Sequence, residues 1–223
     1  MTPAVGERQR AFAVWWKEMD KWDALSAWVR FGFHCQYTLT PLKRLFKVRW
    51  EQVPNCQEDV SMVDRVSFDG EVFAGKKQQT LMDQYIAFPG DIIVSKIRAR
   101  QGSIGIVKSE HGKVSVTIHY RVLVPDSTFV NTEYAWLALR SQFCRAQLLA
   151  ATGGAMKGEI SEEALLNIEL PTPPLPVQQA IVAHWTKAQS SVSEAENQLN
   201  SLKQRVNDYL HSLTVMEPCE RQA

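Results

Sequence analysis

An apolar heptad runs through the last part of the chain and limits what that segment can fold into. From Ile181 to Leu213, apolar or small residues alternate at steps of four and three without a break, for more than four heptads. Such a repeat, flanked by charged side chains, is typical of a coiled coil. A helix of about 50 Å cannot bury this stripe within itself and needs another helix beside it. The seam positions are Ile181, Trp185, Ala188, Val192, Ala195, Leu199, Leu202, Val206, Tyr209 and Leu213.

Two kinds of partner for this seam remain open. The helix could pack on its own domain, or it could pair with a helix of this chain or of another subunit. A strict 3.5-residue repeat favours a two-helix seam, because a broad globular face would use additional positions. Ala188 and Ala195 allow the backbones to approach closely, whereas Trp185 and Tyr209 need space at the two ends. We therefore do not expect a simple parallel copy in register.

Length and composition predict one globular domain with helical extensions. The chain has 223 residues, of which 45% are hydrophobic, and its 25 Lys and Arg almost balance 24 Asp and Glu. This near-neutral balance alone argues against a nucleic-acid-binding protein. The charge is concentrated, however. Between positions 85 and 125 only Asp91 and Glu110 oppose the basic residues, which are Lys96, Arg98, Arg100, Lys108, Lys113 and Arg121.

Several protein classes receive no support. The 4 cysteines form no CxxC pair and none lies near a histidine at zinc-finger spacing, so we expect no metal and no disulfide. The Rossmann, GxSxG and HExxH motifs are absent, and the lysine-containing glycine segment at 151–160 does not match a P-loop. We therefore expect no cofactor and no catalytic residues. No apolar run approaches the roughly 20 residues of a membrane span, and the chain starts without a signal peptide. These features predict a cytoplasmic protein without membrane contact.

Four segments are expected along the chain. Residues 1–34 form an amphipathic, tryptophan-rich helix whose polar face carries acidic as well as basic residues, which disfavours a membrane surface. Residues 35–175 form a β-rich domain, residues 176–215 the long helix and residues 216–223 a disordered tail. Within the β-rich domain we expect strands at 85–88, 91–97, 103–108 and 113–124, with turns at 89–91, 101–103 and 111–113. Helices follow at 132–151, capped by Asn131 or Thr132, and after Ser161.

The best candidate site is the run GDIIVSKIRARQGSIGIV, at positions 90–107. On a strand, Lys96, Arg98 and Arg100 would share one face while Ile97 and Ala99 turn inward. Three cations in a row repel one another, so the array favours a polyanion such as DNA. The predicted DNA-binding residues are Lys96, Arg98, Arg100, Gln101, Ser103, Lys108, His119, Arg121 and Lys157. Gln101, Ser103 and His119 are candidates for base contacts, and the cations for phosphate contacts. A plain solvated strand face explains the same pattern equally well.

Two stretches of the sequence resemble the specificity subunits of type I restriction-modification systems. The first is the run at positions 90–107, and the second is GEISEEALLNIELPTPPLPVQQAIV at 158–182, which leads into the long helix. In that family the target recognition domain ends in an exit motif followed by a helical spacer. The matching residues here are Ile168, Leu170, Pro171, Pro173, Pro174, Leu175, Gln178 and Ile181. The resemblance extends from about Pro41 to Leu213 but does not include the tryptophan-rich segment.

The resemblance implies an α+β fold, with a β-rich mixed target recognition domain, flanking helices and a long C-terminal coiled-coil helix. It also implies a non-catalytic protein that binds double-stranded DNA. Separate modification (methyltransferase) and restriction subunits would then supply methylation and cleavage. A full specificity subunit has two recognition domains and two antiparallel helices, so this chain resembles a half-subunit that self-associates through its C-terminal helix, or a truncated product. The alternatives are a coiled-coil interaction module whose β-rich domain binds protein, and an enzyme of unrecognised type.

Overall fold

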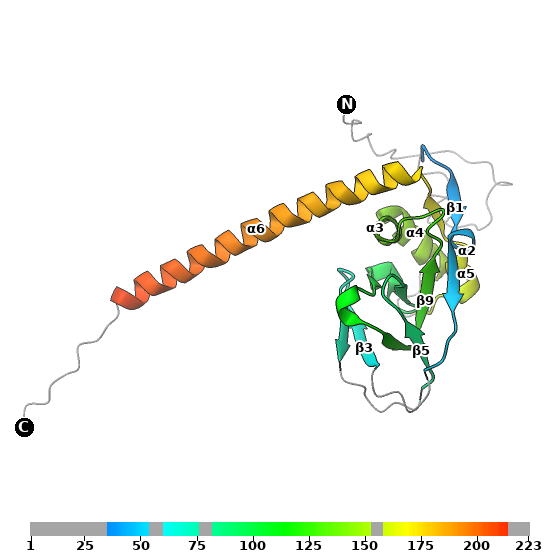
Figure 1. Ribbon diagram of the computed structural model, residues 1–223, viewed down its shortest axis with the longest axis horizontal. Helices are drawn as coiled ribbons and strands as arrows, with labels where there is room; N and C mark the ends of the chain where they lie inside the picture. Colours follow the sequence, from blue (N-terminus) through cyan, green and yellow to red (C-terminus); the bar gives the residue numbers. More distant parts are fainter. Residues whose placement is uncertain (1–34, 54–59, 76–81, 153–157, 214–223) are drawn as a thin grey trace, which may run out of the picture. The chain divides into compact units, whose positions relative to one another are not determined.

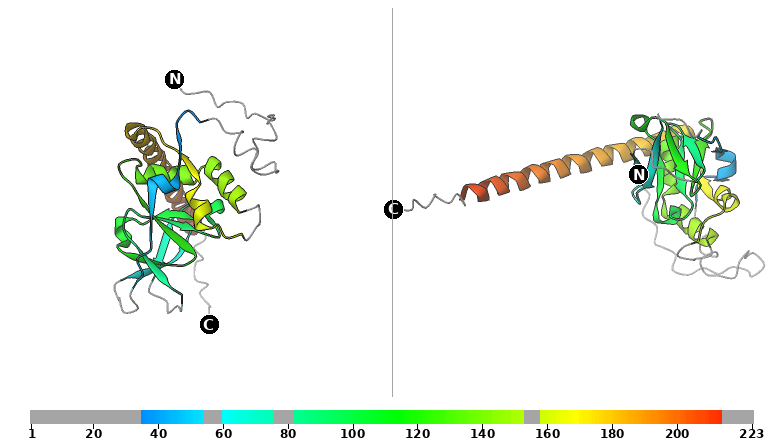
Figure 2. Two further views of the ribbon diagram at one scale, coloured as in Figure 1. Left: turned by 90° about the vertical axis from the view of Figure 1, so that its right-hand side faces the viewer. Right: turned by 90° about the horizontal axis from the view of Figure 1, so that it is seen from below.

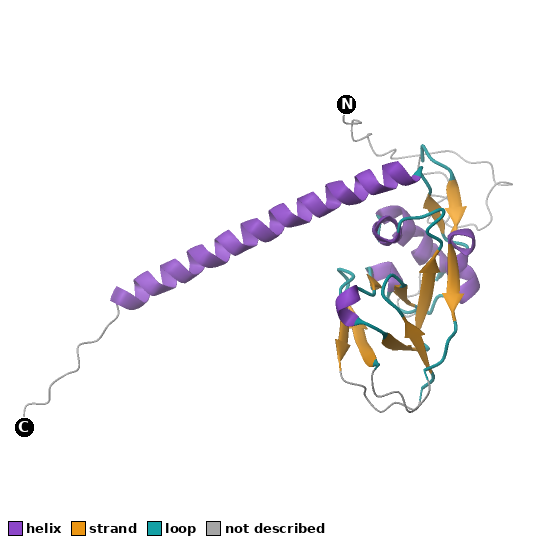
Figure 3. Ribbon diagram, in the orientation of Figure 1, coloured by secondary structure: helices purple, strands orange, loops and turns teal. Residues whose placement is uncertain are grey.

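A computed structural model of the chain describes residues 35–53, 60–75, 82–152 and 158–213. These residues form an α+β fold, as expected (Figure 3), and the chain divides into two compact units, Met1–Gln179 and Ala180–Ala223. The helix expected at 1–34 and the disordered tail expected at 216–223 lie outside the described residues. The predicted borders at 34, 175 and 215 remain predictions.

The first of two four-stranded sheets, called the β6 sheet below, is antiparallel throughout. Its strand order is β2 (Phe46–Arg49), β9 (Tyr120–Pro125), β6 (Ile92–Ser95) and β7 (Ile104–Ile106). All four residues of β6 are buried, which explains why this strand reads as a continuous apolar run rather than an alternating one. Ser95 pairs with Tyr120 at one end of β9, and Phe46 pairs with Pro125 at its other end.

The second sheet, called the β8 sheet, contains one parallel pair. Its order is β4 (Val72–Gly75), β3 (Ser61–Val66), β8 (Val114–Thr117) and β5 (Gln84–Ala87), with β3 and β8 parallel. Side chains from both sheets form one hydrophobic core, to which β3 and β8 contribute Val63 and Val116, and β6 and β9 contribute Ile93 and Val122. β-branched residues suit such a surface because their side chains pack well on pleated strands.

The described residues of this unit also form a short two-stranded sheet and several helices (Figure 1). Strand β1 (Leu39–Pro41) pairs antiparallel with β10 (Glu169–Pro171), so residues far apart in the sequence meet. The helices are α2 (Leu42–Leu45), α3 (Thr132–Leu139), α4 (Gln142–Ala151) and α5 (Glu162–Leu166). The expected caps are confirmed: the Asn131 side chain accepts a hydrogen bond from the backbone N–H of Tyr134, and Ser161 accepts one from Ala164.

Two expected elements are divided in the structure. The strand expected at 113–124 is two strands, β8 and β9, which belong to different sheets. The chain turns at Ile118 and His119, and β-branched enrichment carries no signal for a change of sheet. The helix expected at 132–151 breaks after Leu139, because Ser141 takes an extended conformation and accepts a hydrogen bond from the N–H of Cys144, which caps a new helix.

The C-terminal helix α6 (Leu175–Leu213) is continuous over 39 residues, as the heptad predicts (Figure 1). At 1.5 Å per residue its length is about 60 Å, and the right-hand view of Figure 2 shows the same uninterrupted ribbon. All ten seam residues are exposed, among them Leu199 at 51% and Leu202 at 53%. Within the unit Ala180–Ala223, the described residues contain no second helix that could cover the seam. Among the described residues, none of the helices combines the length and the apolar composition that a membrane span requires.

Candidate nucleic-acid interface

The basic run after β6 forms a tight turn and not an extended strand. Strand β6 ends at Ser95, whose hydroxyl accepts a hydrogen bond from the N–H of Arg98 at 3.2 Å. The chain then enters the 3-10 helix η2 (Ala99–Gln101), which ends at Gly102 with a φ of 104°. The expected strand face of three alternating cations is therefore wrong, because the side-chain alternation of a strand stops at Ser95. Ala99 is buried at 3%, as expected, but Ile97 is 38% exposed instead of turned inward.

Backbone hydrogen bonds fix this turn on several sides. The N–H groups of Gln101 and Ser103 both donate to the carbonyl of Arg98, and the N–H of Ser95 donates to the carbonyl of Ser103. The N–H of Lys96 donates to the carbonyl of His119, which ties the turn to the start of β9. The basic residues of the turn therefore stand on a backbone of defined shape, which reduces the entropy that a bound ligand would cost.

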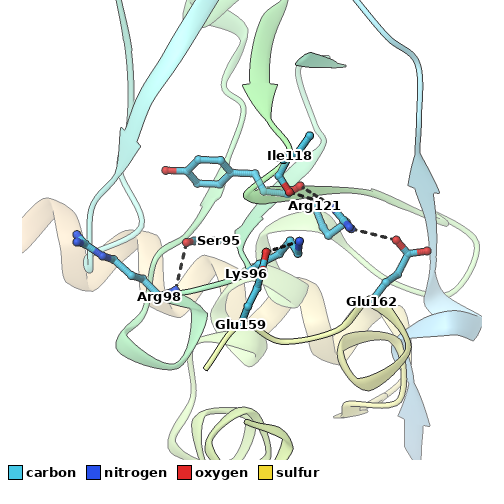
Figure 4. A network of polar contacts seen from close by, with 8 residues as sticks. Ser95, Lys96, Arg98, Ile118, Arg121, Glu159 and Glu162 are labelled. Atoms are coloured by element: carbon cyan, nitrogen blue, oxygen red, sulfur yellow. Dashed lines mark hydrogen bonds and ion pairs between the residues drawn. The ribbon is translucent and has the colours of Figure 1, made fainter. Parts of the chain in front are cut away.

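Two of the predicted cations are neutralised within the protein (Figure 4). The ammonium of Lys96 forms an ion pair with the carboxylate of Glu159, and the Nε of Arg121 donates to Oε2 of Glu162 at 3.0 Å. Arg121 also donates to the carbonyls of Ile118 and Tyr120. These contacts make Arg121 a structural residue that joins β9 to α5. Its positive charge, and that of Lys96, are both balanced before any DNA is present.

The guanidinium of Arg121 also lies over an aromatic ring. Its Cζ is 4.7 Å from the ring centroid of Trp50, which in turn meets the ring of Tyr85 edge-on at 5.3 Å. This cation–π contact adds to the hydrogen bonds that hold Arg121 in place. A phosphate contact would have to compete with all of these interactions.

The ion pair with Lys96 changes the titration of Glu159. The hydrogen bond from Lys96 lowers the pKa of the Glu159 carboxyl below its ordinary value, and the positive charges of Lys96 and Arg121 act in the same direction. The depressed pKa keeps Glu159 ionised at neutral pH and down through its usual range. This carboxylate therefore opposes the positive charge of the turn under physiological conditions.

The other predicted residues differ in how accessible they are. Arg98 and Gln101 are exposed, Arg100 is half-buried, and the exposed Lys108 lies 3.6 Å from a carboxylate oxygen of Glu110. Ser103 is 2% exposed and its hydroxyl donates to the carbonyl of Val66 at 2.7 Å, so the expectation that it contacts a base is wrong for this structure.

Two further predicted residues give less support to the interface. The imidazole Nδ1 of His119 is buried and has no hydrogen-bond partner among the described residues. Lys157 lies outside the described residues. The turn and its surroundings thus leave Arg98, Arg100, Gln101 and Lys108 as the accessible part of the predicted set.

Sequence reasoning missed two arginines near this turn. Nη2 of Arg145 in α4 lies beside Gly102 of the turn, and Nη2 of Arg140 at the end of α3 donates at 3.1 Å to the carbonyl of Phe68, which lies close to Gly102. The only sequence signal was the motif RSQFCR, in which Ser141 can start a new helix. The described residues contain no group of three or more His, Cys, Asp and Glu side chains arranged to hold a metal ion.

The exit motif found in the sequence contains one buried polar residue. Gln178 is fully buried, and its side-chain oxygen accepts a hydrogen bond from the N–H of Asn131 at 2.8 Å. Its amide nitrogen donates to the carbonyls of Pro173 and Phe129. The glutamine therefore fastens the first turn of α6 to the loop before α3.

Comparison with known proteins decides the family. The model of the type I restriction modification DNA specificity domain matches residues 57–204, which is more than half of the chain. The chain belongs to this DNA specificity family. The match includes the turn after β6 and extends well into α6. No curated protein shows a significant sequence match.

Solved structures of the family share the fold at low sequence identity. The HsdS subunit from Thermoanaerobacter tengcongensis is 17% identical with a TM-score of 0.63, and the match covers 87% of this chain and 53% of that one. The type I S subunit from M. genitalium is 16% identical with a TM-score of 0.52, with coverages of 83% and 48%.

A third structure belongs to a study of complex assembly and conformational transition of the type I R-M system. It is 17% identical, with a TM-score of 0.61 and coverages of 86% and 52%. The chain thus spans about half the length of the solved structures it matches.

Proposed function

We propose that this chain is the DNA-recognising component of a type I restriction-modification system and guides separate methyltransferase and restriction subunits to their target. The match of residues 57–204 to the DNA specificity family carries this proposal. The protein performs no bond-making or bond-breaking step in this mechanism. Its contribution is to hold a DNA sequence in a fixed position relative to the subunits that modify or cut it.

The DNA contacts that we propose lie at the turn after β6. Arg98 and Arg100 would bind backbone phosphates, and the exposed amide of Gln101 would reach a base edge, since an amide can pair with adenine through two hydrogen bonds. Lys108 is proposed as a secondary contact at the neighbouring loop. Lys96 and Arg121 can contribute only when their acidic partners, Glu159 and Glu162, release them.

We further propose that the exposed seam of α6 mediates assembly. An apolar stripe of this length needs a helical partner, and a second copy of this chain or a helix of the modification subunit would satisfy it. In a two-fold symmetric dimer, two identical reading units would meet inverted half-sites, because the symmetry of the protein is mirrored in the DNA. The spacing between half-sites would then depend on the helical pair.

Salt dependence of DNA binding tests the proposal. Fluorescence anisotropy of a labelled duplex, with the chain alone and with its modification subunit, should show affinity falling linearly with salt on logarithmic axes between about 50 and 200 mM. Replacing Arg98 with Ala should weaken binding and reduce the slope by about one counterion. Arg44→Ala, an exposed position near the opposite end of the β6 sheet, serves as the charge-matched control.

The same experiment separates the proposal from the alternative of a protein-interaction module. The DNA-recognition function would be contradicted if the chain, alone or with its modification subunit, did not bind duplex DNA. It would also be contradicted if binding did not change with salt. Selection of bound duplexes from a randomised pool should return a preferred sequence. If the selected duplexes show no preferred sequence, sequence recognition is contradicted even where binding depends on salt.

A further inference from the structure

Two arginines outside the predicted site converge on the turn that follows β6. On one continuous helix, residues five apart point about 140° away from each other. The break between α3 and α4 changes this geometry, because Arg140 ends one helix and Arg145 lies in the first turns of the next. Both guanidinium groups consequently reach the same place, which is formed by the carbonyl of Phe68 and the backbone of Gly102.

Gly102 permits this convergence. It has a φ of +104°, and a Cβ at this position would lie 2.4 Å from the carbonyl oxygen of Phe68 and 2.6 Å from Nη2 of Arg145. Any other residue would push the turn and the arginine apart. Because Gly102 directly follows η2, the Arg145 guanidinium lies next to the segment that carries Arg100 and Gln101.

The two arginines lack the acidic partners that neutralise other cations of the domain. Lys96, Arg121 and Arg49 each contact a carboxylate, and Arg49 donates to both oxygens of Asp91. Arg140 and Arg145 form no salt bridge within the described part of the chain, and the Nε of each is buried without an acceptor there. The guanidinium of Arg140 lies over the ring of Trp136, with Cζ 4.5 Å from the ring centroid, but this contact supplies no negative charge.

The electrostatic environment of Arg140 is consistent with this lack of an acidic contact. Burial lowers the pKa of Arg140, the charge of Arg145 lowers it further, and the exposed Asp69 opposes this effect from a distance. Both guanidinium groups still stay charged, since arginine does not lose its proton in proteins. Two adjacent positive charges without a contacting carboxylate are stabilised when an anion lies across them. The planar guanidinium also matches phosphate geometry better than a lysine does.

We propose that Arg140 and Arg145 together bind one backbone phosphate of the DNA, directly beside the turn that carries Gln101. This inference rests on the proposed function, because the phosphate is taken to belong to the duplex that the turn reads. The contact would fix the register of the DNA, so that Gln101 faces a defined base. It would add affinity without sequence preference of its own.

The test compares the wild-type chain, assembled with its modification subunit, with the double variant Arg140→Gln/Arg145→Gln. Anisotropy is measured over a salt series on a selected duplex and on an unrelated one. We expect the double variant to bind both duplexes more weakly by the same factor and to lower the salt slope by about two. The matched control Arg44→Gln/Lys47→Gln removes two exposed charges near the opposite end of the β6 sheet and should leave the slope unchanged.

Several outcomes would overturn the inference. One is a double variant whose salt slope for DNA binding equals that of the wild type. Another is that inorganic phosphate stabilises the wild-type fold and not the double variant, while the two proteins have the same salt slope for DNA binding. If the glutamine variant fails to fold, as judged by circular dichroism, Arg140→Lys/Arg145→Lys keeps both charges. The lysine variant should therefore keep the salt slope of the wild type. If it folds but its salt slope is lower by two, the argument from charge is contradicted. Absence of salt-dependent binding by the wild type would instead contradict the proposed function itself.

Discussion

Gln178 is a buried polar side chain that holds the first turn of α6 against the loop before α3. It makes three hydrogen bonds to backbone groups, of Asn131, Phe129 and Pro173, and is inaccessible to solvent. Replacement by Ala would leave these backbone groups unsatisfied, so we expect the free energy of unfolding to fall by about 2–4 kcal/mol in urea denaturation. The neighbouring Gln179→Ala, at an exposed position, should change it by less than about 0.5 kcal/mol. Equal losses in the two variants would contradict this role.

At the scale of elements, α3 is tied to β10 by a buried phenol. The hydroxyl of Tyr134 donates to the carbonyl of Pro171 at 2.8 Å, and burial, followed by the nearby Cys35 and Cys144, raises the pKa of Tyr134 from 10.0 to about 12. In the unfolded chain the Tyr134 hydroxyl loses its proton near its ordinary pKa, whereas in the folded chain it loses the proton only at a higher pH. The contribution is thus fully present below pH 10 and is lost as the pH rises toward 12.

We therefore expect the free energy of unfolding of the wild type to decline above pH 10. The free energy of unfolding of Tyr134→Phe should decline less steeply, so that by the upper end of this pH range the wild type has lost about 2–3 kcal/mol more than the variant. Burial likewise raises the pKa of Cys144, to about 12, and this thiol is present in both proteins, so the comparison isolates the tyrosine. Tyr209→Phe, at a 65% exposed position, should keep the wild-type profile. Identical profiles for wild type and Tyr134→Phe would exclude Tyr134 as the cause.

The same elements show how far the sequence predicts the fold. Caps and turns are local signals, and Asn131, Ser161 and the glycine turns at Gly90, Gly102 and Gly112 behave as predicted. The division of α3 from α4 was missed because Ser141 resembles any polar residue on a helix until tertiary contacts select its capping conformation. The acidic partners of Lys96 and Arg121 are more than forty residues away in sequence, so no local pattern could reveal them.

At the scale of the whole molecule, charge placement and not total charge distinguishes the candidate interface. The chain is nearly neutral, with 25 basic and 24 acidic residues. Arg49, Lys96 and Arg121 each contact a carboxylate within the fold. Around the turn after β6, Arg98, Arg140 and Arg145 make no salt bridge within the described residues. Net charge alone does not show this uneven pairing, which supports the proposal that a nearly neutral chain carries a local site for a polyanion.

Assembly through the long helix is the property of the whole molecule that the exposed seam predicts. We expect Leu199→Asp/Leu202→Asp to abolish self-association or binding of the modification subunit, because a buried unpaired carboxylate is strongly unfavourable in a helical seam. Light scattering measures the mass, and circular dichroism checks that the unit Met1–Gln179 stays folded. Asn200→Asp/Ser201→Asp adds the same charge to the same turn outside the seam and should preserve assembly. A seam variant with the mass of the wild type, both alone and with the modification subunit, would remove α6 from the assembly role while leaving the DNA-binding proposal intact.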